Sequence, residues 1–286
     1  MDRLLFGDNQ FFGVNHMSEE KARAQAMRFR DTGAVIEVLD AALDEGIRSF
    51  MCTTHERIGE VCGHMRANPA RYRDYVFYPC MPYAHKYNNA VAELGMLGAL
   101  KKFLPSGGIL DAALQGGMAL ATKDIERVMR LLIDAEMKMF EGLNTPVVFL
   151  QNVVVDFLMG LRFKDAFRVF AAHVKQRYAA EPGFITMNLP RLLDLLDDVG
   201  IDNPIVCANI NKIAFRMCGG REAYERALAT RRFRPIAMSV FASGALPARE
   251  ALEYVCGQKA IRSIVFGASS RANIRQTRQL VQELDS

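Results

Sequence analysis

Eight short apolar runs recur along the 286-residue chain, and longer segments of helical periodicity lie between them. The runs cover residues 3–7, 47–52, 75–80, 146–152, 183–188, 204–209, 235–240 and 263–268. A strand with one face in water alternates apolar and polar residues, and these runs do not. Unbroken apolar runs are typical of parallel strands that are covered on both faces.

The segments between the runs have apolar residues every three to four positions, and glycine closes several of them, as at helix ends. The clearest are 33–46, 123–142, 164–180, 190–200, 221–230, 247–257 and 271–284. Eight strands that alternate with helices in a chain of this length predict a single domain, 1–286, with the (β/α)8 or TIM-barrel fold. Residues 84–121 are too long for an ordinary strand–helix connection. We interpret them as a partly helical insertion after the third strand, a lid over the catalytic end or a contact for oligomerisation.

Composition excludes several classes of protein. Half of the residues are hydrophobic and 24% are charged, which predicts a sizeable core rather than disorder. The net charge of +4 is small, and the basic run at 231–235 suits a solvated strand flank better than a nucleic-acid contact. The sequence has no run of 18 consecutive apolar residues, so we predict no membrane span, and the N-terminus lacks a signal-peptide pattern. Six scattered cysteines without metal-ligand spacing favour a reducing compartment. We expect a cytoplasmic protein that acts on a small molecule.

Three stretches suggest a family. They are AVIEVLDAALDEGIRSF at 34–50, IAMSVFASGAL at 236–246 and VFGASSRANIRQT at 265–277. Through them the chain resembles the aldo/keto reductases over most of its length outside 84–121. The resemblance implies a TIM barrel whose last two strands carry a cofactor-phosphate site, with NADP(H) as the family cofactor. The residues themselves leave the cofactor open.

The turn after the last predicted strand favours an anion on physical grounds. Ser269 and Ser270 can cap the helix that follows, its free N–H groups attract negative charge, and Arg271 and Arg275 lie one turn apart. The resemblance adds Ser239, Gly267 and Asn273 to this predicted cofactor- or phosphate-binding set. The alternative is that the serines only cap the helix.

The family's catalytic Asp, Tyr, Lys and His are not found at the matching positions. Met51 stands at the Asp position and Glu56 near the Tyr position. Cys80-Met81-Pro82 stands in the Lys region, and Asn152 or Val153 at the His position. Met238 replaces the aromatic residue on which the family stacks the nicotinamide. These departures predict that the standard reductase chemistry has been lost.

Polar residues at the strand ends suggest what replaces it, because barrel active sites form there. His16, His55, Glu56 and His85 are a predicted acid/base cluster, since imidazole titrates near neutral pH. A divalent-metal site and ordinary loop residues are the alternatives; without tight ligand spacing we predict no metal.

Other polar residues at these ends complete the predicted site. Tyr83 is a candidate substitute proton donor. Lys212 is a candidate Schiff-base lysine, although a solvated role fits its place beyond the strand better. Cys52 and Cys80 could act as nucleophiles if a neighbouring charge lowered their pKa; buried packing is the commoner role of such residues. The predicted substrate-binding residues are Asn9, Gln10, Gln151, Asn152, Asn188 and Asn209.

The sequence therefore favours an enzyme of isomerase or lyase type. It would act by acid/base catalysis on a small polar, phosphorylated or sugar-like carbonyl metabolite, with His55 and Glu56 as the leading acid/base pair. The first alternative is an NADPH-dependent oxidoreductase with a substitute proton donor. The second is a non-catalytic binding or regulatory barrel.

Overall fold

The computed structural model describes residues 1–14, 17–83 and 118–285, with only the backbone at 118–125 and 128. The predicted insertion lies almost wholly outside these residues. Only 118–121 are described, and they begin helix α6.

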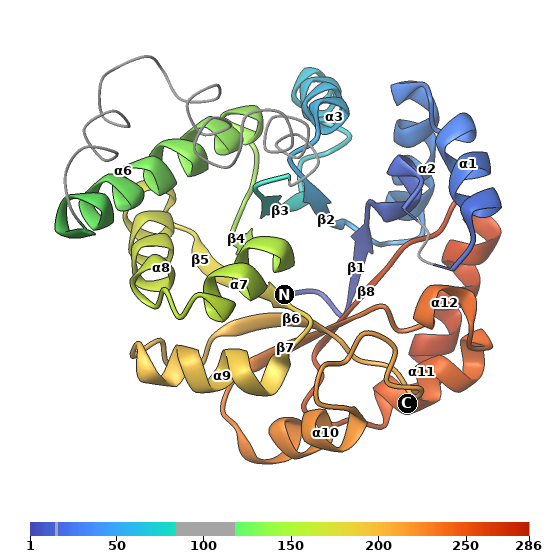
Figure 1. Ribbon diagram of the computed structural model, residues 1–286. Coiled ribbons are helices and arrows are strands. Elements are labelled where there is room, and N and C mark those ends of the chain that lie inside the picture. The colour runs from blue at the N-terminus through green and yellow to red at the C-terminus, as the bar shows by residue number, and fades with distance from the viewer. Residues whose placement is uncertain (15–16, 84–117, 286) are drawn as a thin grey trace.

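The eight predicted strands form a closed parallel barrel in chain order, so the predicted fold is confirmed (Figure 1). Each strand pairs in parallel with the next, and β8 pairs with β1. The strands are β1 Leu4–Gly7, β2 Ser49–Thr53, β3 Val76–Met81, β4 Val147–Leu150, β5 Glu181–Thr186, β6 Ile205–Asn209, β7 Arg234–Met238 and β8 Ser263–Phe266.

Helices surround the ring of strands (Figure 1). They are α1 Glu19–Arg28, α2 Thr32–Asp44, α3 Glu56–Ala67, α6 Met118–Met137, α7 Asn152–Gly160, α8 Asp165–Tyr178, α9 Leu189–Asp198, α10 Arg221–Thr230, α11 Ala248–Cys256 and α12 Arg271–Leu284, with short 3-10 helices η1 Asn9–Phe12, η2 Lys138–Phe140 and η3 Ala242–Gly244. In the part of the chain that the structure covers, no helix is long and apolar enough to cross a bilayer.

Two helices differ from the sequence prediction. Helix α1 is polar and buries no residue, so it has no apolar stripe for a periodicity argument to find. Helix α7 begins at Asn152, whereas the sequence predicted a strand over 146–152; β4 ends at Leu150. The β-branched run Val153–Val155 reads locally as strand, but tertiary packing makes it helical.

A compact apolar cluster fills the barrel. Its buried members are Leu5, Met51, Tyr78, Cys80, Val147, Phe149, Ile185, Ile205, Cys207 and Ile236. The Phe149 ring lies over Gly183, where a Cβ would come within 2.3 Å of Cε1 of that ring. The interior is therefore a packed core, and the open end of the barrel is the place left for chemistry.

A second, larger apolar cluster lies between the strands and the helices. Helix α9 shows how the sequence builds it. Pro190 lies in its first turn, where no backbone donor is needed, and Leu189, Leu192, Leu193 and Leu196 are buried. Burying a leucine side chain contributes about 1.5–3 kcal/mol, so this face holds the helix to the barrel.

Candidate active site

Because all eight strands are parallel, their carboxyl ends meet at one end of the barrel, which we call the mouth. Asp8 directly follows β1 there and is 6% exposed. Its Oδ2 accepts hydrogen bonds from the Thr53 backbone N–H and from Thr53 Oγ1, each at 2.7 Å. Burial raises the pKa of Asp8, against the two bonds from Thr53, which lower it. Asp8 is thus a carboxyl that takes a proton more readily than an ordinary aspartate.

His55 precedes the first residue of α3 and caps that helix. Its Nδ1 accepts the Arg57 backbone N–H at 3.0 Å, so in the neutral ring the proton is on Nε2. Burial lowers the pKa of His55, and the Arg57 charge lowers it further. The ring stacks on Phe12 at 4.2 Å between centroids. His55 therefore offers a neutral N–H donor rather than a free base.

Tyr83 follows β3, and its ring lies edge-on to His55, 5.1 Å between centroids. Burial raises the pKa of Tyr83, and the charge of Asp8 raises it further, so the phenol keeps its proton at neutral pH. The Tyr83 backbone N–H donates to Thr54 Oγ1 at 3.2 Å. The Thr54 hydroxyl in turn donates to Glu136 of α6, which is 2% exposed. These bonds hold the backbone at Tyr83.

We call Asp8, Phe12, His55 and Tyr83 the Asp8 cluster, because the three rings pack together and the Asp8 charge acts on Tyr83. Its three polar groups come from three adjacent strand ends, β1, β2 and β3. One is a proton acceptor with a raised pKa, and two are neutral hydrogen-bond donors. Such a set can remove a proton from a carbon atom while a neighbouring oxygen receives hydrogen bonds.

The remaining predicted catalytic residues lie apart from this cluster or outside the described residues. Glu56 is exposed in the first turn of α3, where a carboxylate suits the positive end of the helix dipole. Lys212 is exposed and pairs with Glu250 at 2.8 Å, which agrees with a solvated role. His16 and His85 lie outside the described residues. The structure thus joins only His55 and Tyr83 of this set, and their catalytic role stays a prediction.

Two of the six predicted substrate amides are buried and bonded within the fold. Gln10 is 5% exposed and donates from Nε2 to the Gly7 carbonyl at 2.8 Å. Asn209 is 1% exposed and donates from Nδ2 to the Arg216 carbonyl at 2.9 Å, which ties down the loop after β6. The other four lie at or beside helix starts: Asn9 begins η1, Gln151 and Asn152 begin α7, and Asn188 precedes α9.

In the predicted phosphate-binding turn, Ser270, Arg271 and Arg275 form hydrogen bonds with other groups of the protein. Ser270 Oγ accepts the Asn273 N–H at 3.3 Å and so caps α12, while Ser269 is half-buried beside it. Arg271 Nε and Arg275 Nη2 donate to Glu45 Oε1 at 3.1 and 2.8 Å. The Glu45 side chain is 5% exposed, and Arg275, followed by Arg271, lowers its pKa. A phosphate would have to compete with this carboxylate for both arginines.

The position of Glu45 makes that competition harder. Glu45 follows the last residue of α2 and precedes β2, at the opposite end of the barrel from the mouth. The guanidinium groups of Arg271 and Arg275 are drawn toward that end by their bonds to Glu45.

The fit of NADP(H) can be tested on these residues. A Cβ at Gly267 would lie 2.1 Å from Gln10 Oε1, so the space beside this glycine is filled by a side chain of the protein itself. Ser239 follows β7 with a left-handed φ of 54°, and Met238 packs against the cluster inside the barrel. A cofactor phosphate bound by the predicted set would have to displace the contacts of both arginines with Glu45, and phosphate or cofactor binding at this turn stays a prediction.

The two candidate thiol nucleophiles are packing residues. Cys52 and Cys80 are buried, and burial raises the pKa of each thiol well above its usual value, with the Asp8 charge adding to it. Thiols held protonated are poor nucleophiles. Among the residues whose positions are given, no three His, Cys, Asp or Glu gather as metal ligands.

Sequence reasoning gave little weight to Asp8, Phe12, Thr53 and Thr54. A carboxylate directly after an apolar strand, as in RLLFGD, was a visible signal for Asp8. The bond from Thr53 spans 45 residues, and no local pattern reveals it.

Comparison with known proteins supports the fold. Two solved structures from Pseudomonas aeruginosa, both described as a candidate aldo-keto reductase, align over 99% of this chain and 90% of theirs, with TM-scores of 0.60 and identities of 12% and 14%. A structure described as a candidate 2,5-diketo-D-gluconic acid reductase B aligns over 98% of this chain and 85% of its own, at 9% identity and a TM-score of 0.54. No family model matches the sequence, and no curated protein matches it. The chain therefore has the barrel architecture of these aldo-keto-reductase-like structures.

Proposed function

We propose that this chain is a small-molecule enzyme that moves a proton at a polar carbonyl compound without a redox step. The observation that carries the proposal is the Asp8 cluster, in which the buried Asp8 carboxyl is near enough to Tyr83 for its charge to raise the pKa of that phenol, and the rings of Tyr83 and His55 are in contact. The substrate would be a hydroxylated or phosphorylated carbonyl metabolite, and the chemistry isomerisation or elimination.

The proton transfer can be written with these residues. Both bonds from Thr53 go to Asp8 Oδ2, so Oδ1 is the oxygen to accept a proton from the carbon next to the carbonyl group. The electron pair of that C–H bond moves to the carbonyl oxygen, which Tyr83 O–H and His55 Nε2–H stabilise as an enolate. The substrate carries a hydroxyl group on the carbon that lost its proton. That hydroxyl group passes its proton to the enolate oxygen and becomes the new carbonyl group, and Asp8 returns the first proton to the former carbonyl carbon, which completes an isomerisation.

The rival function is an NADPH-dependent oxidoreductase in which Tyr83 donates the proton. It is favoured by the descriptions of the structural neighbours, which are named as reductases. Against it stand the paired arginines at the α12 turn and the pKa of Tyr83, which is raised rather than lowered.

Deuterium exchange tests the proposal without a known substrate. Hydroxy-carbonyl compounds, free and phosphorylated, are incubated with the protein in D2O, and NMR follows deuterium uptake beside the carbonyl. We expect uptake with at least one compound, and Asp8→Asn should slow it by about 10²–10⁴-fold, the usual worth of a general base.

Asp202→Asn serves as the control, since Asp202 is exposed and only loosely paired with Arg232 at 3.5 Å. Equal rates for wild type and Asp8→Asn would remove Asp8 from the mechanism. NADPH oxidation by the same compounds, together with a fluorescence change on NADPH binding, would establish the rival.

A further inference from the structure

A groove of about 1080 Å³ opens at the amino-terminal end of the barrel, opposite the mouth. Its walls come from four segments: the chain before β1, the turn between α2 and β2, the connection between α3 and β3, and the last turns of α12. Its volume is that of a small-molecule site. The proposed proton transfer makes no use of it.

The charged lining of this groove consists of four carboxylates, Asp2, Glu45, Asp74 and Asp285, and five arginines, Arg3, Arg48, Arg71, Arg73 and Arg278. Two of the arginines are fully engaged. Arg3 binds both carboxylate oxygens of Asp285, each at 2.7 Å, and Arg71 binds Asp44 at 2.6 Å. These pairs shape the groove and leave little charge for a ligand.

The other three arginines keep donors that no carboxylate satisfies. Arg278 Nε is buried without any acceptor among the described atoms, and its Nη2 is 3.6 Å from Glu45. Arg48 Nε is 3.4 Å from Asp2, a carboxylate that already accepts from Ser49 Oγ at 2.7 Å.

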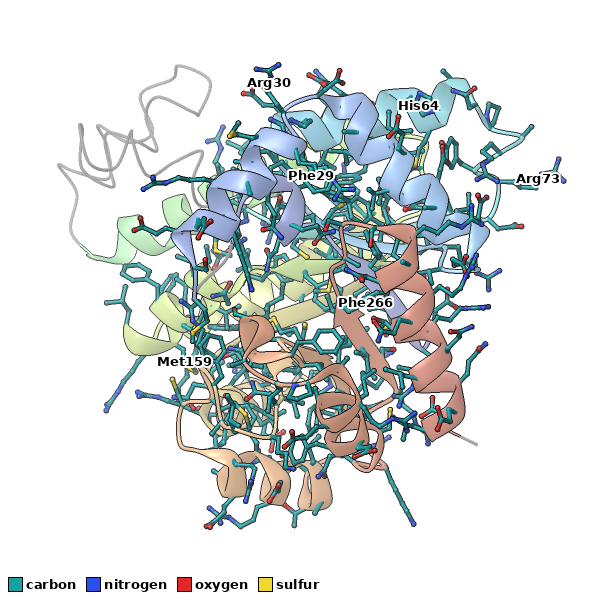
Figure 2. All side chains as sticks on the ribbon, turned by 90° about the vertical axis from the view of Figure 1, so that its right-hand side faces the viewer. Phe29, Arg30, His64, Arg73, Met159 and Phe266 are labelled. Atoms are coloured by element: carbon teal, nitrogen blue, oxygen red, sulfur yellow. The ribbon has the colours of Figure 1, made fainter. Side chains whose placement is uncertain are left out.

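Arg73 stands at the edge of the molecule (Figure 2), is exposed, and forms no ion pair with any described residue. Asp74 beside it is likewise exposed and unpaired within the described segments, so three under-satisfied arginines face one open carboxylate.

We propose that this groove binds a small polyanion that carries a diphosphate group. Guanidinium groups present planar forks of N–H donors that match phosphoryl oxygens in pairs. Arg48, Arg73 and Arg278 come from three separate wall segments, so an anion with several oxygens on more than one centre satisfies them better than a single small ion. The buried Nε of Arg278 gains the acceptor that it lacks.

Titration with inorganic pyrophosphate tests the site. Calorimetry and thermal unfolding are run against sodium chloride of matched ionic strength, because screening alone changes the stability of a charged protein. We expect saturable binding and a rise in Tm with pyrophosphate concentration. Arg73→Ala should weaken binding at least fivefold, and its fold is secure because the exposed side chain has no described partner. Arg278→Gln should weaken binding further.

Arg232→Ala is the matched control, an exposed arginine outside the groove that should leave the titration unchanged. A nucleoside diphosphate that binds more tightly than pyrophosphate would identify a nucleotide as the source of the group; equal affinity would assign recognition to the diphosphate alone. The site is refuted if sodium chloride reproduces the shift in Tm, or if Arg73→Ala and Arg278→Gln both titrate as wild type. The deuterium-exchange experiment tests the mouth of the barrel alone, so its outcome does not depend on whether the groove binds pyrophosphate.

Discussion

The two sides of the barrel mouth use their polar side chains differently. On the β1–β3 side, the rings of His55 and Tyr83 pack against Phe12, and Asp8 directly follows β1, with both bonds from Thr53 on one of its carboxylate oxygens. On the β6 side, Asn209 and Asn211 are 1% and 0% exposed, and their side-chain amides form hydrogen bonds with the backbone of the loop that follows.

The difference separates an asparagine whose donor and acceptor both hold one loop from a carboxyl whose burial opposes its charged form. Asn211 Nδ2 donates to the Phe215 carbonyl, and its Oδ1 accepts the Phe215 N–H, so one side chain closes a turn of the loop. Asp8, in contrast, is a buried carboxyl whose ionisation is opposed by its surroundings. A buried titratable group of this kind at the mouth of a barrel is a candidate for a functional residue.

The largest effect on stability should come from Asn211→Ala. The substitution leaves the Phe215 N–H and C=O without their partner, which should lower the free energy of unfolding by about 2–3 kcal/mol. Urea unfolding measures it. Asn152→Ala, a half-exposed asparagine with no described bond, is the control and should change stability by less than about 0.5 kcal/mol. Equal losses of unfolding free energy in the two variants would mean that the buried bonds of Asn211 do not set the β6 side apart.

An intermediate effect should appear in the pH dependence of stability. The folded pKa of Asp8 is raised, so the folded state binds the Asp8 proton more tightly than the unfolded state does. Between the ordinary aspartate pKa and the raised folded value, ionisation of Asp8 therefore costs stability as pH rises, by up to about 1.4 kcal/mol per pH unit.

The free energy of unfolding of wild type minus that of Asp8→Asn isolates this contribution from the other carboxylates. We expect this difference to fall from pH 4 upward and to level off above the folded pKa of Asp8. A difference that rises over the same interval would mean that Asp8 is stabilised as an anion, and the acid/base role would lose its basis.

The smallest effect is expected for Lys212→Met. The side chains of Lys212 and Glu250 are 46% and 42% exposed, and exposed ion pairs contribute about 0–1 kcal/mol. Unfolding free energy and deuterium exchange should both stay near wild type. Loss of deuterium exchange in Lys212→Met, or reductive trapping of a carbonyl compound on Lys212, would support the Schiff-base hypothesis and would place the reaction on the β6 side of the mouth.

Much of the fold followed from periodicity. Every predicted strand is present within a few residues, because a strand buried on both faces leaves an unbroken apolar run. The errors fall where that signal is weak or misleading. Helix α1 buries no residue, and in α7 the first residue, Asn152, is followed by three valines whose local preference is for strand.

The site was less predictable than the fold. The strand-end rule placed His55 and Tyr83 at the mouth, yet it equally placed Asn209, which the fold uses itself. Residue type and position could not tell these cases apart, since the difference lies in the partner of each polar atom.

The amino-acid sequence by itself determined the barrel, because the spacing of apolar residues decides which faces must be buried whatever the loops contain. Only the tertiary structure decided which polar groups have hydrogen-bond partners within the protein. Arg275 meets Glu45 across 230 positions of the chain, and Thr53 meets Asp8 across 45. Hydrogen bonds act over about 3 Å in space, so their partners are set by folding and leave no mark in the local pattern.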